Sequence, residues 1–307
     1  MNRKTLVLLT ASFLALSVAA PRGGQESLSR ITTRDGTFVN TRAGRVFRPM
    51  GFNYIRLYPG PGWHTTFAPD LYEPERAEKM LAELGQRDFN VVRVFIDHRS
   101  GSGIVKSRDA TELSNRYMEN FVNFTRRARA HGIYVVPTFP YVPRSKPYRD
   151  LIGGDHPHVK GHNRYYLQEG YIRAKCHYLA DFARAIKRQD PSLLTSILAF
   201  ELENETHFNA QEPPFSLDEG TLEAPNGERY ELGDAADLQR MADQNVVHWA
   251  NRCAESIRRV DPDALVAASM FTFRAVGRTR PGKLGDETSH DARFPARPAA
   301  LARSNLS

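Results

Sequence analysis

The sequence predicts an α/β fold in which a parallel β-sheet is covered by helices. Apolar runs of strand length alternate with longer amphipathic segments between Met50 and Phe273. Strands separated by helical crossovers form parallel sheets. The runs are almost continuously apolar, as expected for strands that are buried on both faces.

Five strands and four helices are expected behind an N-terminal β-hairpin. The hairpin is placed at residues 37–40 and 46–48, around a turn with Gly44. The expected strands cover residues 50–56, 89–96, 133–139, 194–202 and 264–273. The expected helices cover residues 74–84, 111–130, 165–188 and 238–260. Residues 140–162 and 206–234 are predicted to be long loops, and no strand or helix is expected after Phe273.

The first residues have the order of a secretory signal. Arg3 and Lys4 precede an apolar run from Leu6 to Val18, and small residues follow it. The run is shorter than the roughly 18–20 apolar residues that a membrane span needs. We therefore expect a signal peptide at residues 1–19, a domain at residues 20–307, and a secreted or periplasmic protein without stable membrane association.

The basic charge does not indicate a nucleic-acid partner. The formal net charge is +7, but the leader contributes +2 and the tail from Arg274 to Ser307 contributes +4. The rest of the chain is therefore nearly neutral and has no basic stripe with interleaved aromatic residues. The two cysteines, Cys176 and Cys253, both fall in helical patterns. They are expected to be buried thiols, although an oxidising compartment permits a disulfide.

The most informative segment is the end of the fourth expected strand. An apolar run ends in the letters FELENE at residues 200–205. Side chains alternate along a strand, so Glu201, Glu203 and Glu205 are predicted to share one face if the strand stays regular. Buried carboxylates are costly unless they are paired or hydrated. This cost favours a functional site at the carboxyl end of the strand, although solvated loop acids are the simpler alternative.

This strand end resembles glycoside hydrolase family 5, the cellulase family, and its clan of retaining (β/α)₈ barrels. The family's fourth strand carries a glutamate, two further residues and then Asn-Glu, which match Glu201 and the pair Asn204 and Glu205. The segment GFNY at residues 51–54 resembles the first strand of the family. The letters FNVVR at residues 89–93 resemble the second strand. The resemblance covers roughly residues 30–273 and implies a TIM barrel, of which about five βα units are present.

The resemblance also implies roles for individual residues. Glu205 would be the general acid/base of a retaining two-carboxylate mechanism that cleaves β-linked polysaccharide such as glucan or mannan. Asn204 would hold the sugar 2-hydroxyl, and Arg93 would orient a carboxylate or form a structural ion pair. The predicted substrate-binding residues are two polar residues on the strands and two aromatic residues on the loops: Asn53, Glu201, Trp63 and Tyr141. The resemblance implies an oligosaccharide or polysaccharide substrate and no cofactor.

Two features depart from the family pattern. The family's nucleophile is a glutamate at the end of the seventh strand, whereas Glu287 is the only glutamate after Phe273 and lies at no strand end. A histidine expected near the end of the third strand is also not visible. The sequence therefore predicts a barrel that is incomplete at its C-terminus, without its nucleophile, and inactive as it stands.

Two other functions are compatible with the sequence. A non-catalytic carbohydrate-binding relative would need no nucleophile. A metal-dependent barrel hydrolase would use the closely spaced loop histidines His156, His158 and His162. The glycoside hydrolase interpretation includes no metal site.

Overall fold

The computed structural model describes residues 28–56, 64–272 and 292–307, so the predicted leader and Trp63 lie outside the described residues. The strands are β1 Ile31–Arg34, β2 Thr37–Asn40, β3 Gly51–Tyr54, β4 Val91–Phe95, β5 Tyr134–Thr138, β6 Phe200–Glu201, β7 Phe208–Asn209, β8 Thr221–Glu223, β9 Arg229–Glu231, β10 Val266–Ala267 and β11 Arg293–Phe294. The α-helices are α1 Pro74–Gln86, α2 Asn115–Ala130, α3 Lys146–Ile152, α4 Arg164–Leu167, α5 Glu169–Gln189, α6 Ala235–Arg258 and α7 Pro298–Leu301. Three 3₁₀ helices are η1 Ser100–Ser102, η2 Gly161–Asn163 and η3 Pro191–Ser196.

A five-stranded parallel sheet forms the centre of the molecule. Its strand order is β10-β6-β5-β4-β3, which is sequential from one edge to the other. The register places Asn53 beside Arg93 on β3 and β4, and Thr138 beside Glu201 on β5 and β6. Each of the five predicted strands is present, although the fourth is shorter because η3 replaces its first residues. The predicted βα architecture is confirmed.

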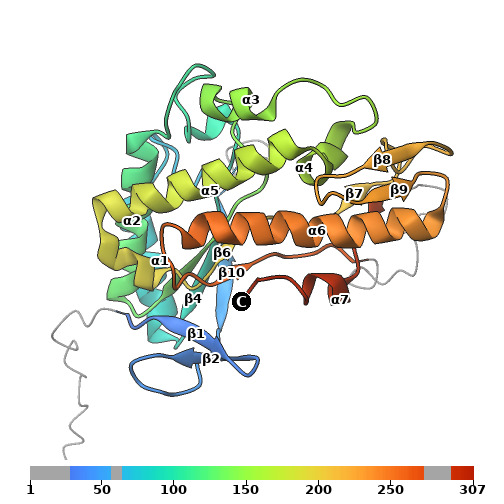
Figure 1. Ribbon diagram of the computed structural model, residues 1–307. Helices are drawn as coiled ribbons and strands as arrows, with labels where there is room; N and C mark the ends of the chain where they lie inside the picture. Colours follow the sequence, from blue (N-terminus) through green and yellow to red (C-terminus); the bar gives the residue numbers. More distant parts are fainter. Residues whose placement is uncertain (1–27, 57–63, 273–291) are drawn as a thin grey trace, which may run out of the picture.

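The helices cover one side of the sheet and form the main core with it. Helices α5 and α6 pack along each other, and α1 packs on α2 (Figure 1). The strand residues that face the helices, such as Val92, Val94 and Phe200, are at most 1% exposed. Transfer of such side chains from water stabilises the fold by roughly 1.5–3 kcal/mol each. The opposite side of the sheet carries the polar groups of the site.

The N-terminal hairpin is present, but with a different pairing from the one predicted. Strand β2 pairs antiparallel with β1 around a turn at Asp35 and Gly36, whereas Val46 contributes only an isolated bridge to Val39. Gly36 has a φ of +70°, a left-handed conformation that glycine adopts without strain. Phe38 and Ile31 pack with Leu198 under the sheet. Leu198 therefore lies on the side of the sheet that faces the hairpin and not among the helices.

Three irregular segments contain structure that the sequence did not predict. The first predicted loop contains α3 and η2, and the second contains β7, β8 and β9. The tail contains β11, which pairs with β7, and the short helix α7. The prediction of no strand or helix after Phe273 is therefore wrong. Such elements are only two to seven residues long, which is too short for a periodic pattern to show.

The chain end also contacts the sheet. The backbone N–H of Ser307 donates to the carbonyl oxygen of Val266 at 3.0 Å, and Figure 1 shows this end beside β10. Arg258 on α6 donates to Asn305 and Ser307 and fixes this segment. The tail therefore covers part of the β10 edge of the sheet at this position.

The two cysteines lie on the neighbouring helices α5 and α6. Both are buried free thiols, and their sulfur atoms are 3.9 Å apart. The expectation of buried thiols is therefore confirmed for the structure described. Among the described residues, no helix combines the length and apolar character needed to cross a membrane.

A buried ion pair attaches the segment before β1 to the body of the fold. Arg30 donates from both terminal nitrogens to the Asp261 carboxylate, at 2.8 and 2.9 Å, and also to the carbonyl of Leu194. The Asp261 residue is 4% exposed. Loss of one partner from a buried pair leaves an uncompensated charge.

We predict that Arg30→Met lowers the free energy of unfolding by about 3 kcal/mol, because Asp261 stays buried without its cation. Urea denaturation measures the change. The double variant Arg30→Met/Asp261→Asn removes the stranded charge and should recover part of the loss. Equal stability of Arg30→Met and the unaltered chain would contradict the role of this pair.

Candidate active site

The three glutamates at the end of β6 do not share one face. Strand β6 ends at Glu201, and the backbone then leaves the regular extended conformation. Glu201 and Glu203 are buried, whereas the Glu205 side chain is 56% exposed. The alternation rule holds only while the strand continues. The prediction of one common face is therefore wrong, and the three carboxylates have three separate environments.

Glu201 lies on the sheet face opposite the helices and holds a cluster of polar side chains. Its Oε2 accepts from Arg93 Nε at 2.5 Å and from the Thr138 hydroxyl. Arg93 also donates from Nη1 to Asn53 Oδ1 at 3.2 Å and from Nη2 to Asn204 Oδ1 at 3.0 Å. A guanidinium presents five N–H donors in a fixed fork, so one arginine can orient three acceptors. Four predicted site residues therefore meet here.

These polar groups border a cavity of about 400 Å³ on the open side of the sheet. Asn53, Arg93 and Glu201 contribute the polar part of its lining. The remaining lining residues are apolar or small: Phe38, Pro49, Gly51, Phe52, Val91, Val136, Leu198, Ala199 and Ala267. Arg93 is only partly covered, and its guanidinium carbon lies 4.6 Å from the centre of the Phe95 ring.

Glu203 faces helix α5. Its Oε2 accepts from the backbone N–H of Tyr141 at 3.0 Å and lies 3.7 Å from Lys175 Nζ. Burial raises the pKa of Glu203, and the neighbouring Lys175 counteracts this shift. Burial also lowers the pKa of Lys175, whose ammonium group donates to the carbonyl oxygens of Phe139 and Tyr141. The pair fixes the loop after β5, and Glu203 is not available to a substrate.

Glu205 is the accessible carboxylate of the segment. Its backbone has a φ of +53°, a left-handed conformation that is uncommon for a non-glycine residue. Its backbone N–H donates to Ser269 Oγ at 3.0 Å, and that hydroxyl donates to the carbonyl of Glu203. Oε2 of Glu205 lies 3.4 Å from Arg293 Nη1. This turn directs the carboxylate away from the buried polar cluster.

A row of rings lies beside Glu205 at the same end of the sheet. His207 donates from Nδ1 to the Glu205 carbonyl at 2.5 Å and stacks on His162, with ring centres 4.3 Å apart. The His162 ring is 5.8 Å from Tyr141, which is 4.9 Å from His98. Burial lowers the pKa of both His98 and His162 to about 4. We call these four rings, His98, Tyr141, His162 and His207, the aromatic row.

The loop histidines do not form a metal centre. His162 belongs to the aromatic row, whereas the ring centres of His156 and His158 are 6.4 Å apart in a separate contact. Among the described residues, no group of three or more His, Cys, Asp or Glu side chains could hold a metal ion. The arrangement gives the metal-dependent alternative no support.

Several residues of the site were not predicted from the sequence. Lys175 and Thr138 hold the two buried glutamates, Ser269 holds the Glu205 turn, and Arg293 reaches it from β11. One signal was available, because Lys175 falls on the buried face of α5 between apolar neighbours. A buried lysine requires a partner. The other three contacts depend on the packing of segments that are far apart in sequence.

Comparison with solved structures identifies the class of this fold. An endo-1,4-β-mannanase from Rhizomucor miehei matches with a TM-score of 0.53 and 13% identity, over 90% of this chain and 69% of the mannanase. A β-mannanase from the blue mussel Mytilus edulis has a TM-score of 0.49 and 15% identity, over 81% of this chain and 65% of its own. The exo-β-1,4-mannosidase Op5Man5 from Opitutaceae bacterium strain TAV5 has a TM-score of 0.48 and 16% identity, over 78% of this chain.

The chain spans 34% of the length of that mannosidase and 65% of the mussel enzyme. No protein-family model matches the chain, and no curated protein matches it. The likeness to the Rhizomucor enzyme nevertheless shows the fold. The chain has the α/β fold of the TIM-barrel glycoside hydrolases, and the predicted resemblance to family 5 is confirmed at the level of the fold.

We predict that Lys175→Met destabilises the chain in a pH-dependent way. Removal of the ammonium group raises the pKa of Glu203 further above its value in the unfolded chain. A carboxyl group whose pKa is higher in the folded state destabilises that state only above the pH at which the same group ionises in the unfolded chain. The loss relative to the unaltered chain should thus be smallest near about pH 4, where only the hydrogen bonds of Lys175 to the two carbonyls are missing, and grow toward about pH 7.

Urea denaturation across this pH range measures the effect. In a Glu203→Gln background the position no longer titrates, so Lys175→Met should then cause a loss that does not change with pH. A loss in the single variant that stays constant over the range would show that Lys175 does not compensate Glu203.

Proposed function

We propose that this chain is a glycoside hydrolase domain acting on β-linked polysaccharide such as glucan or mannan, with Glu205 as general acid/base. The main support is the pair Asn204 and Glu205 at the carboxyl end of β6, adjoining the polar cluster around Arg93. Active sites of (β/α)₈ barrels lie at this end of the strands. Glu205 has an accessible carboxylate, as a group that protonates a leaving oxygen requires.

Asn204 is suited to hold the sugar 2-hydroxyl. Its Oδ1 accepts from Arg93 Nη2, which directs the amide nitrogen away from the guanidinium. The nitrogen can then donate to a hydroxyl of the bound sugar. Such hydrogen bonds strengthen in the oxocarbenium-like transition state. Arg93 is therefore a positioning residue, because it acts through Asn204 and Glu201.

Retention needs a second carboxylate roughly 5 Å from the acid. Neither buried glutamate is proposed as this nucleophile, because Glu201 binds Arg93 and Glu203 faces Lys175. No other described residue is proposed for this role. This arrangement equally suits the second candidate, a carbohydrate-binding relative without catalysis. Hydrolysis measurements on the purified chain separate the two candidates.

We predict that, in a form of the enzyme that includes its nucleophile, Glu205→Gln lowers turnover of β-glucan or mannan by about 10²–10⁴-fold, because the leaving oxygen loses its proton donor. The release of reducing sugar measures turnover. Aryl glycosides with good leaving groups should be affected less in the first chemical step. Glu223→Gln, at an exposed residue of β8, is the matched control and should retain activity.

Three outcomes distinguish the candidates. Polysaccharide hydrolysis that persists in Glu205→Gln contradicts the assignment of the acid. Oligosaccharide binding without hydrolysis in the unaltered chain supports the binding relative. Activity that is lost on chelation and restored by a divalent cation would favour the metal-dependent alternative.

Export would bring the chain to polysaccharides that lie outside the cell. We propose that the leader is a cleaved signal and that the protein is secreted or periplasmic. N-terminal sequencing of exported protein should begin at or within a few residues of Ala20. A mature protein that still begins at Met1 would overturn this proposal.

A further inference from the structure

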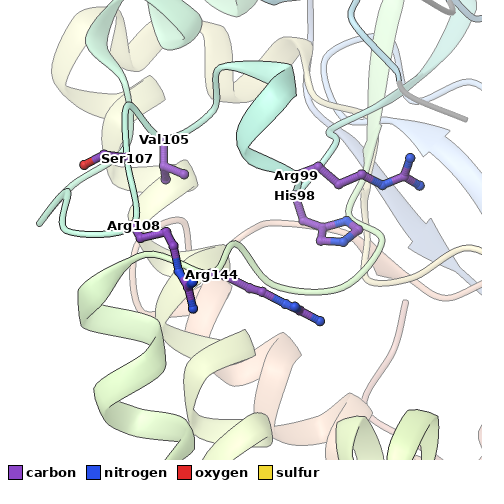
Figure 2. Close-up of a pocket in the computed structure, with 6 residues that line it drawn as sticks. All are labelled: His98, Arg99, Val105, Ser107, Arg108 and Arg144. Carbon is purple, nitrogen blue, oxygen red and sulfur yellow. The ribbon is translucent and has the colours of Figure 1, made fainter. Parts of the chain in front are cut away.

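A basic pocket lies next to the aromatic row. Its volume is about 430 Å³, and Figure 2 shows the residues that line it. His98 and Arg99 come from the segment after β4, and Arg144 comes from the loop after β5. The other lining residues, Val105, Ser107 and Arg108, belong to the segment before α2. The β4–α2 connection, which contains both of these groups, and the loop after β5 therefore meet at this pocket.

The lining of the pocket carries three guanidinium groups and no carboxylate. Arg99 Nε lies 3.7 Å from the buried Asp97, which offsets part of its charge. Arg108 and Arg144 are exposed, and neither forms an ion pair with a carboxylate of the described residues. By contrast, many arginines elsewhere pair with an acid, among them Arg30, Arg93, Arg126, Arg127, Arg149, Arg184 and Arg252.

His98 adds an apolar and neutral wall. Burial lowers its pKa to about 4, and the nearby Arg99, Lys175 and Arg144 lower it as well, against the effect of Asp97. The ring is therefore uncharged at neutral pH, and the arginines provide the positive charge of the lining. Guanidinium groups bind carboxylates and sulfate-like oxyanions through parallel N–H···O hydrogen bonds. The lining thus suits an anion attached to a larger neutral molecule.

The aromatic row connects this pocket to the candidate acid. Tyr141 contacts His98 on the pocket side and His162 on the other side. His162 stacks on His207, which donates a hydrogen bond to the Glu205 carbonyl. Sugar rings present apolar C–H faces to such rings. A glycan that extends from Glu205 along the row would reach the pocket with one of its later sugars.

We propose that this pocket is a subsite for a negatively charged substituent on the glycan, either the carboxylate of a uronic acid or a sulfate ester. Arg108 and Arg144 bind the substituent, and Arg99 supports it from the segment after β4. The inference rests on the proposed function, because it assigns the class of glycan that the same site binds. The preferred substrate is therefore an acidic β-linked polysaccharide rather than a neutral one.

Binding of matched oligosaccharides tests the proposal without requiring hydrolysis. The probes are cellotetraose, mannotetraose, and forms of each that carry carboxylates or sulfate esters at C6. Calorimetric titration of the purified chain at about 0.15 M salt, where long-range attraction is screened, measures each affinity. We expect at least one charged form to bind about tenfold or more tightly than its neutral parent, in line with charge-assisted hydrogen bonds.

The double variant Arg108→Gln/Arg144→Gln should abolish this preference and leave the affinity for the neutral parent unchanged. The double variant Arg34→Gln/Arg188→Gln removes the same charge from exposed residues outside the pocket and should retain the preference. Circular dichroism and thermal melting check that both variants fold. The preferred charged form, carboxylate or sulfate, identifies the substituent.

The binding measurements distinguish failure of the acidic subsite from failure of the proposed function. Equal affinity for charged and neutral forms, or the same loss in both double variants, overturns the acidic subsite and leaves the proposed function standing. If no oligosaccharide binds, charged or neutral, the proposed function fails and the subsite fails with it.

Discussion

The ion pair between Arg93 and Glu201 is the interaction on which the site depends. A carboxylate that is 7% exposed costs several kcal/mol to bury unless it is paired and hydrogen-bonded. Thr138 supplies part of that compensation from the neighbouring strand β5, and Arg93 supplies the rest from β4, the next strand beyond it. The same guanidinium then reaches Asn53 and Asn204. One arginine thereby joins three strands of the sheet and fixes the residue that precedes the candidate acid.

The end of β6 decides which glutamate can act. If the strand continued, Glu201, Glu203 and Glu205 would all project from one face and their like charges would repel. The chain instead leaves the extended conformation after Glu201, and Glu205 adopts a positive φ. Glu203 can then pair with Lys175 on α5, and Glu205 reaches solvent. Backbone strain of order 1–3 kcal/mol at Glu205 is a cost that the surrounding contacts must offset.

Charge is distributed unevenly along the carboxyl end of the sheet. The candidate acid lies near Arg293 at one end of the aromatic row, and three arginines surround the pocket at the other end. Two histidines between them, His98 and His162, are held neutral by burial, which lowers the pKa of each to about 4. A neutral, partly apolar strip with a cationic end is a suitable surface for a sugar chain whose charges lie outward from its rings.

The sequence by itself determined the parallel sheet, the order of its strands along the chain, and Arg93 with the three polar residues that it contacts, Asn53, Glu201 and Asn204. Long apolar runs and a strand-end motif carry this information locally, because a buried strand needs apolar residues wherever it lies. Tertiary structure alone decided the separate environments of the three glutamates, the short elements of the loops and tail, and the basic pocket. Lys175, Ser269 and Arg293 lie between 28 and 88 residues from the glutamates they contact. Contacts between segments so far apart depend on how helices and loops pack, and no local pattern records that packing.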